Sequence, residues 1–224
     1  MTAAMCVRKG CRMCDVGCDH GKLAAWLVEQ DLVESAIAVD VSEKSLEKAK
    51  ALFSLRNLSD KAQARLGFGL TVVAPHEADD IVIAGLGFDT IQAIMQTTRW
   101  LEDEGKRLIL VPSSHHARLR SWLGQQGYGI QRETAIESAS HLYTVMTVGY
   151  DGVVREHDAA YAALGEVPFG GEQAQEYIDM VEKSARKILD NSESIEKCKE
   201  ALEVVQAVGI LHLLKEKKPE PHVG

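Results

Sequence analysis

The sequence predicts an α/β fold: a Rossmann-like, mostly parallel sheet with an antiparallel hairpin at one edge, followed by a C-terminal helical hairpin or coiled coil. Over residues 11–150, short β-branched or aliphatic runs alternate with helical patterns, as is typical of βαβ units. The last two runs have no helix between them, so they are expected to pair antiparallel. Beyond residue 172, apolar side chains recur at steps of three and four, the spacing of one helix face.

The first 150 residues contain seven predicted strands and four predicted helices. The strands are expected at Cys11–Val16, Ser35–Asp40, Ala62–Leu66, Asp80–Ala84, Lys106–Val111, Gly129–Ile136 and Tyr143–Val148. The helices are expected at Lys22–Glu29, Glu43–Leu55, Thr90–Gln96 and His115–Gln125. Ser42 stands directly before the second helix, where a serine side chain is a favoured N-cap.

The chain is expected to have three parts. Residues 1–150 form the Rossmann-like domain, and residues 151–171 are expected to be a linker because glycine and proline recur there. Residues 172–224 carry two antiparallel helices, over about 172–190 and 193–217, and a frayed tail from Lys215 onward. This hairpin is expected either to close the domain or mediate dimerisation, or to act as an arm that contacts a large substrate.

Composition and charge describe a globular chain of ordinary kind. It is 46% hydrophobic and 26% charged, with a formal net charge of -8, which is the wrong sign for binding nucleic acid over its whole surface. Most of the excess negative charge falls after residue 150, so the net charge does not exclude a local basic patch on residues 1–150. Charged residues early in the chain disfavour a signal peptide, and no apolar run is long enough for a membrane span. A cytoplasmic location is therefore expected.

Five cysteines are present, four of them between Cys6 and Cys18. An odd number in a chain of this size does not indicate a disulfide framework, so reduced thiols are expected. The spacing of Cys11 and Cys14 also allows a zinc-binding interpretation. On a strand, however, residues an odd number apart point to opposite faces, and no metal site is expected.

An acidic, glycine-rich turn follows the first predicted strand, in the string Asp15-Val16-Gly17-Cys18-Asp19-His20-Gly21. Glycines at such a turn let a ligand approach the backbone, and Asp15 can accept hydrogen bonds from a ligand's ammonium or hydroxyl group. Asp40 follows Gly21 by nineteen residues, at the end of the second strand, where a carboxylate holds both ribose hydroxyls of an adenosine. Asp19 replaces the middle glycine of the dehydrogenase motif, and its charge repels a pyrophosphate but attracts a sulfonium or ammonium. The residues favour S-adenosylmethionine over NAD.

The strings DVGCDHGKLA, AIAVDVSEKSLEKAK, IAGLGF and LVPSSHHARLRSWL resemble the bacterial tRNA (adenine-22-N1)-methyltransferases, the TrmK-like group. The resemblance extends from about Arg12 to Asp151, and the helical hairpin matches the coiled-coil extension of that group. It implies the class I methyltransferase sheet, S-adenosyl-L-methionine as cofactor and tRNA as partner. A monomer or a homodimer is expected.

The predicted site has three groups of residues. The cofactor is expected to contact Asp15, Gly17, Cys18, Asp19, Gly21, Asp40, Val41, Gly67, Phe68, Gly85, Leu86 and Gly87. Asp19 is the candidate carboxylate near the reacting centre, with His20 beside it; orienting the cofactor loop is an alternative role for His20. Pro112, Arg118 and Arg120 are the candidate substrate contacts, and Arg8, Lys9 and Arg12 are further possible phosphate contacts, against the alternative that such arginines and lysines are merely solvated.

The sequence departs from the family pattern at several predicted ligand positions. Phe68 stands where the family has an aspartate, Phe88 stands where it has glycine, and Val111-Pro112-Ser113 replaces Gln-Pro-Asn. About ten residues precede the first strand, where the family has a helix, so a truncated start or a divergent paralogue is expected. These departures keep open a cofactor-binding relative with another substrate or none. An NAD-dependent oxidoreductase is a second alternative, disfavoured by Asp19.

Overall fold

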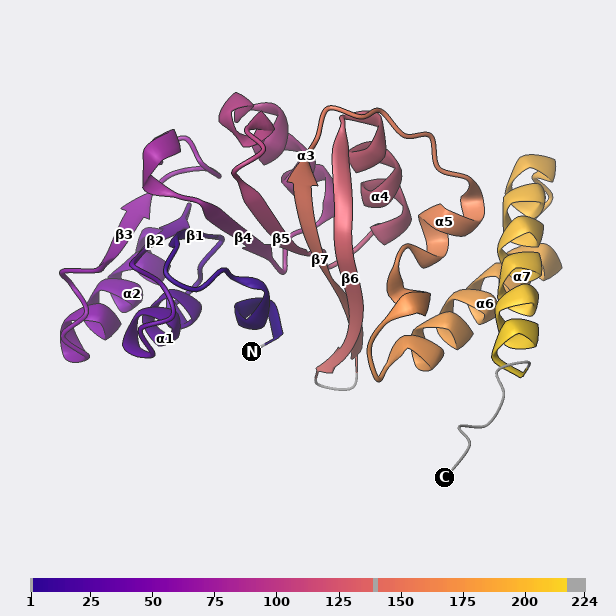
Figure 1. Cartoon of the computed structure of the whole chain (residues 1–224), viewed down its shortest axis with the longest axis horizontal. Helices are drawn as coiled ribbons and strands as arrows, with labels where there is room; N and C mark the ends of the chain where they lie inside the picture. The colour runs from indigo at the N-terminus through magenta and orange to yellow at the C-terminus, as the bar shows by residue number, and fades with distance from the viewer. Residues whose placement is uncertain (1, 139–140, 217–224) are drawn as a thin grey trace, which may run out of the picture.

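The computed structural model describes residues 2–138 and 141–216 (Figure 1). Seven strands form one sheet in the order β3-β2-β1-β4-β5-β7-β6. Their bounds are β1 Arg12–Val16, β2 Ser35–Asp40, β3 Ala62–Leu66, β4 Asp80–Ala84, β5 Arg107–Val111, β6 Tyr128–Ser138 and β7 His141–Tyr150. The first five strands are parallel, and β7 is antiparallel to both β5 and β6. The predicted sheet and its antiparallel edge are confirmed.

Helices cover both faces of the sheet and continue beyond its β6 edge. They are α1 Lys22–Glu29, α2 Glu43–Leu55, α3 Phe88–Gln96, α4 His116–Gln125, α5 Ala159–Leu164, α6 Ala174–Asn191 and α7 Ile195–Glu216. Buried side chains of α1 and α2 pack on one face, and those of α3 and α4 pack on the other. Ser42 is the N-cap of α2 and accepts a hydrogen bond from the Ser45 backbone N–H at 3.2 Å, as predicted. Figure 1 shows α6 and α7 beyond the β6 edge of the sheet, at the opposite end of the molecule from β3, with α7 farther from β6 than α6.

The segment expected to be a linker, residues 151–171, is partly helical, because it contains α5 and one further short helix. Asp158 caps α5 by accepting a hydrogen bond from the Tyr161 N–H at 2.7 Å, and a short 3-10 helix follows at Val167–Phe169. Leu164 at the end of α5 is buried in one cluster with Ile178 of α6 and Val208 of α7. The two predicted C-terminal helices are present, and α7 includes Lys215, which was expected in the frayed tail. The remainder of that tail, residues 217–224, lies outside the described residues.

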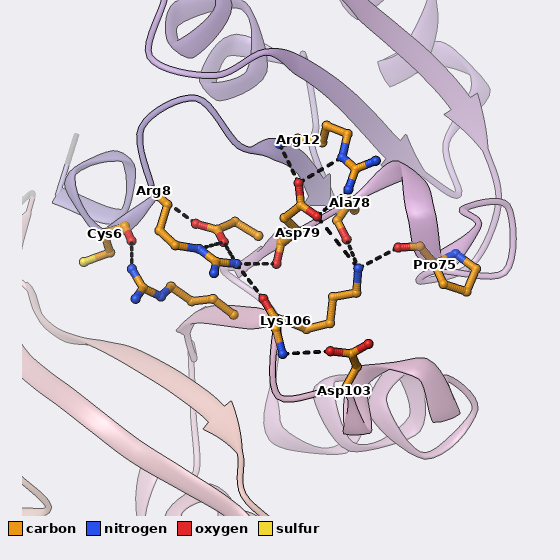
Figure 2. A network of polar contacts seen from close by, with 11 residues as sticks. Cys6, Arg8, Arg12, Pro75, Ala78, Asp79, Asp103 and Lys106 are labelled. Atoms are coloured by element: carbon orange, nitrogen blue, oxygen red, sulfur yellow. Dashed lines mark hydrogen bonds and ion pairs between the residues drawn. The ribbon is translucent and has the colours of Figure 1, made fainter.

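The amino ends of β1, β4 and β5 are joined by a network of charged groups (Figure 2). Asp80 is fully buried, and its carboxylate accepts hydrogen bonds from the Arg8 backbone N–H and from Arg8 Nε, both at 2.6 Å. Arg12 binds Asp79 through two nitrogens, and Lys106 binds the Pro75 and Ala78 carbonyl groups. Arg8 and Arg12 therefore have structural partners, at the edge of the sheet opposite the carboxyl ends.

Within the described residues there is neither a helix suited to span a membrane nor a cluster of side chains suited to hold a metal ion. None of the helices they form is long and apolar enough to cross a bilayer. Nor do residues 2–138 and 141–216 bring three or more histidine, cysteine, aspartate or glutamate side chains into an arrangement suited to a metal ion.

Candidate functional site

The carboxyl ends of β1, β2 and β4 meet at one edge of the sheet, and backbone hydrogen bonds fix the loops that follow them. Gly17 N and Cys18 N donate to the Val39 carbonyl at 2.9 and 3.1 Å, which ties the β1 loop to β2. Gly85 N donates to the Val111 carbonyl at 2.9 Å, which ties the β4 loop to β5. This is the edge at which open α/β sheets bind ligands.

Gly17 brings the β1 loop against the β4 loop. Its φ of +73° lies in the left-handed region, where side chains are strained. A Cβ at this position would lie 3.4 Å from the side chain of Leu86, so the two loops are in contact. Gly17, predicted to line the cofactor pocket, therefore lies next to Leu86 in the Gly85–Gly87 loop, which the resemblance places beside the transferred methyl group.

Asp40 is held ready to accept further hydrogen bonds. Its Oδ1 accepts from the Ser42 backbone N–H at 2.8 Å, and its Oδ2 accepts from the Asp19 backbone N–H at 3.0 Å. An ionised carboxylate offers about four lone-pair sites, so each oxygen retains capacity for a ligand hydroxyl. The backbone bonds fix the orientation of the carboxylate before any ligand arrives.

Asp15 is the buried acid of the site. It is 5% exposed, and burial raises the pKa of its carboxyl to about 7, with the nearby charge of Asp40 as a smaller contribution in the same direction. Among the described residues, no side-chain hydrogen bond reaches this carboxylate. A cationic ligand group is the partner that would stabilise its ionised form.

Asp19 and His20 lie on the side of the site that faces α2. The Asp19 carboxylate is 72% exposed, and its Oδ1 is 3.3 Å from His20 Nε2. His20 Nε2 is also 2.9 Å from Nζ of Lys48, which α2 supplies. Sequence reasoning missed Lys48, although the βαβ pattern places the first turns of α2 beside the β1 loop. These three side chains form one polar cluster next to the β1 loop.

The remaining predicted cofactor residues lie around Asp40 and the β1 loop. Gly67 N donates to the Asp40 carbonyl at 3.1 Å, so the β3 loop joins the site. Phe68 and Val41 are exposed and offer apolar surface that can pack on a flat ring. Cys18 is buried, and burial raises the pKa of its thiol to about 12, which keeps the thiol neutral. Gly21 packs directly against α2.

Phe88 lies mostly in the core and also lines one end of a groove that is described below. Its side chain is 4% exposed and meets the Trp122 ring edge to face, with 6.4 Å between ring centroids. The Arg118 guanidinium lies over the Phe88 ring at 4.6 Å from the centroid. Phe88 is therefore part of the core between α3 and α4.

Of the three predicted substrate contacts, only Arg118 has an exposed side chain. Arg118 is 61% exposed in its side chain, whereas Pro112 is buried. Arg120 is 0% exposed and pairs with the buried Glu133, so its prediction as a surface phosphate contact is wrong. Its five N–H groups are bound inside the protein.

A groove of about 1390 Å³ extends from Phe88, past the start of α4, to α6 and α7. His115 and Arg118 line one end of the groove, and Lys197 and Glu200 of α7 line the other. His115 has a φ of +58°, a left-handed conformation that is uncommon for a side chain other than glycine. The groove begins at Phe88, the residue directly after the Gly85–Gly87 loop.

Comparison with known proteins gives consistent results. A family model described as "Methyltransferase domain" matches residues 1–146. The tRNA (adenine(22)-N(1))-methyltransferase of Bacillus subtilis is 31% identical over 163 residues, which cover 73% of this chain and 67% of the Bacillus protein.

Solved structures extend the similarity to the C-terminal helices. A Streptococcus pneumoniae protein described as a candidate tRNA (m1A22) methyltransferase, solved with S-adenosyl-L-methionine, is 27% identical with a TM-score of 0.76, covering 94% of this chain and 96% of its own. The Bacillus subtilis M1A22 tRNA methyltransferase TrmK has the same fold, with 23% identity, a TM-score of 0.76 and 95% coverage of both chains.

Proposed function

Because this chain belongs to the tRNA (adenine(22)-N(1))-methyltransferase family, we propose that it transfers a methyl group from S-adenosyl-L-methionine to N1 of an adenine in tRNA. The observation that carries the proposal is the pair of carboxylates at the carboxyl edge, Asp15 and Asp40, around a glycine turn that touches the β4 loop. The comparisons favour neither an oxidoreductase nor an inactive relative.

The residues present suit the cofactor. We assign the ribose hydroxyls to Asp40, whose two oxygens are already oriented by backbone N–H groups. The amino group is assigned to Asp15, the buried carboxylate without a protein donor among the described residues. Val41 and Phe68 are assigned to the faces of the adenine ring, and the Gly85–Gly87 loop to the methyl side.

The chemistry requires positioning more than proton transfer. When bound, S-adenosyl-L-methionine supplies an electrophilic methyl group. Adenine N1 has a lone pair of its own, so this chain's main task is to hold the nitrogen in line with that group. Asp19 and His20, predicted from the sequence as catalytic, lie with Lys48 on the α2 side, and we assign them to positioning of the cofactor. In this proposal residues 1–150 form the domain that binds the cofactor, and residues 172–224 form the C-terminal helical hairpin.

Cofactor affinity is expected to rise with pH through the titration of Asp15. An ammonium group binds the ionised carboxylate, whose pKa in the unliganded chain is about 7. Affinity should therefore increase about tenfold between about pH 5 and pH 6, the change in the ionised fraction of Asp15 over a range in which the ligand's amino group stays protonated. Calorimetry on the parent and on Asp15→Asn measures this. The variant should bind more weakly and lack the added pH dependence; identical pH profiles in the two proteins would contradict the assignment.

The same pKa sets a trend in stability for the unliganded chain. Unfolded, Asp15 has its ordinary pKa near 4, and folded it has a pKa of about 7. Between these values the folded chain keeps the proton and the unfolded chain releases it. The Asp15 contribution to the unfolding free energy therefore falls as pH rises from about 4 to about 7. Above about pH 7 this contribution stays constant, because Asp15 is ionised in both states.

Arg118 is expected to contact an RNA phosphate. Its side chain is exposed at the Phe88 end of the groove, next to the Gly85–Gly87 loop. The distance from its Nη2 to Oδ1 of Asp89 is 3.9 Å. Arg118→Ala should weaken tRNA binding and lower the slope of log affinity against log salt by about one unit. Arg99→Ala is the matched control, because Arg99 is exposed and pairs with Glu102 away from the groove. An unchanged slope in Arg118→Ala would remove this residue from the RNA path.

Methyl transfer to transcribed tRNA tests the proposed function. The parent chain should incorporate labelled methyl groups from S-adenosyl-L-methionine into unmodified tRNA that carries adenine at position 22. A transcript with guanine at that position should remain unlabelled. Equal labelling of both transcripts would reject the position, and the absence of labelling despite cofactor binding would reject the activity.

A further inference from the structure

Arg120 is the centre of a buried hydrogen-bond network that the proposed reaction does not use. Its Nη2 donates to Glu133 Oε1 and to the Tyr177 hydroxyl, both at 2.8 Å, and its Nε donates to Glu133. Its Nη1 donates to the carbonyl groups of Ala162 and Ala163 at 2.7 and 2.8 Å. All five N–H groups of this arginine are therefore satisfied.

The network joins four elements that are far apart in the sequence. Arg120 lies on α4, Glu133 on β6, the two alanines on the last turn of α5 and Tyr177 on α6. The guanidinium binds carbonyl groups at the C-terminal end of α5, where positive charge is favourable. Gly165, with a φ of +57°, allows the close approach, since a Cβ there would collide with Glu133 and Arg120. The network is the polar joint between the sheet domain and the C-terminal helices.

The same network connects the two walls of the groove. One wall of the groove is α4 with Phe88, and the other is α6 and α7, while α5 and Tyr177 lie between them. Arg120 projects from the first wall and binds both α5 and the second wall. The groove also contains His115 and Arg118, so it opens toward the proposed site of methyl transfer.

We propose that Arg120 is a positioning residue for tRNA. It holds α6 and α7 at a fixed distance from α4, so that RNA in the groove lies in register with the Gly85–Gly87 loop. The inference rests on the proposed function. It assigns no contact with substrate to Arg120, whose side chain is buried.

Steady-state kinetics on three variants test the proposal. Arg120→Met with Glu133→Leu replaces the buried ion pair by apolar side chains of similar size, which limits the loss of stability. Tyr177→Phe removes a single hydroxyl and keeps the ring. Arg56→Met is the matched control, because Arg56 is half exposed and pairs with Glu29 between α1 and α2. For each folded variant, KM and kcat for tRNA and the Kd of S-adenosyl-L-methionine are measured, with active protein counted by cofactor binding.

We expect the KM for tRNA to change in these variants, while kcat and the Kd of the cofactor stay nearly constant. In the double variant, KM for tRNA should rise about tenfold or more, while kcat and cofactor Kd stay within about threefold of the parent. Tyr177→Phe should raise KM about two- to threefold, and Arg56→Met should not change it. A general loss of folded protein lowers the active fraction and leaves KM unchanged. A raised KM with constant kcat and cofactor Kd therefore distinguishes a positioning role of the network from a loss of stability.

The opposite results overturn the proposal. A double variant that folds and keeps the parent KM shows that the network only stabilises the protein. If the double variant does not fold, an unchanged KM in Tyr177→Phe has the same meaning. Should the parent fail to methylate tRNA, the proposed function fails, and direct tRNA affinities of the same variants still decide whether the network positions an RNA-binding surface.

Discussion

Replacing Asp40 with alanine is expected to weaken S-adenosyl-L-methionine binding roughly 100-fold. Each charge-assisted hydrogen bond to a ribose hydroxyl contributes about 1.5 kcal/mol or more, and Asp40 would make two. The substitution also frees the backbone N–H groups of Asp19 and Ser42, which the carboxylate orients. Titration calorimetry at one pH and salt concentration measures the change directly.

Two further variants make the Asp40 result specific. Asp60→Ala removes an exposed carboxylate from the turn before β3, at the other end of the strands, and should leave the affinity unchanged. Asp40→Asn keeps the shape and some accepting capacity, and should lie between the parent and alanine. An Asp40→Ala affinity equal to that of Asp60→Ala would remove Asp40 from the cofactor site.

Replacing Arg120 alone with alanine is expected to lower the unfolding free energy by about 3 to 5 kcal/mol, the typical cost of breaking a buried ion pair. Arg120 and Glu133 have side-chain exposures of 1% and 0%. Without the arginine, the Glu133 carboxylate stays buried with the Glu166 backbone N–H as its remaining described donor. The Ala162 carbonyl at the end of α5 also loses its partner. Denaturant unfolding of the unliganded chain measures the loss.

An exposed pair on the same side of the molecule provides the control. Arg186 pairs with Glu182 one turn earlier on α6, and its side chain is 60% exposed. Arg186→Ala should cost less than about 0.5 kcal/mol, because such helix-surface pairs contribute little. Similar losses for Arg120→Ala and Arg186→Ala would show that the buried pair does not stabilise the joint.

The sequence predicts the sheet well because its signals are local. Five parallel strands between helices and an antiparallel edge follow from where apolar runs and helical patterns alternate, and Ser42 follows from capping chemistry. Helix α5 was missed because six residues among glycines and prolines give a weak pattern. Its signals were Asp158 as a possible N-cap and Leu164 as an apolar residue that needs burial.

Side-chain surroundings were harder to predict than strand positions. Asp15 and Asp40 could be placed because both stand at the carboxyl ends of strands. Arg120 could not, since its partners Glu133 and Tyr177 are distant in the sequence and reach it only through the fold. The burial of Phe88 could not be predicted for the same reason: it is the first residue of α3, and its ring packs against Trp122 of α4 while it lines the groove.

The identity of the methylated nucleoside decides whether this chain transfers a methyl group to N1 of an adenine in tRNA. Unmodified tRNA is incubated with the chain and S-adenosyl-L-methionine, digested to nucleosides and analysed by chromatography and mass spectrometry against authentic standards. We expect 1-methyladenosine as the product, in an amount approaching one per tRNA, and we expect its loss with Asp40→Ala at limiting cofactor. Tight cofactor binding with no methylated nucleoside, or with the methyl group on another atom or base, would contradict this expectation.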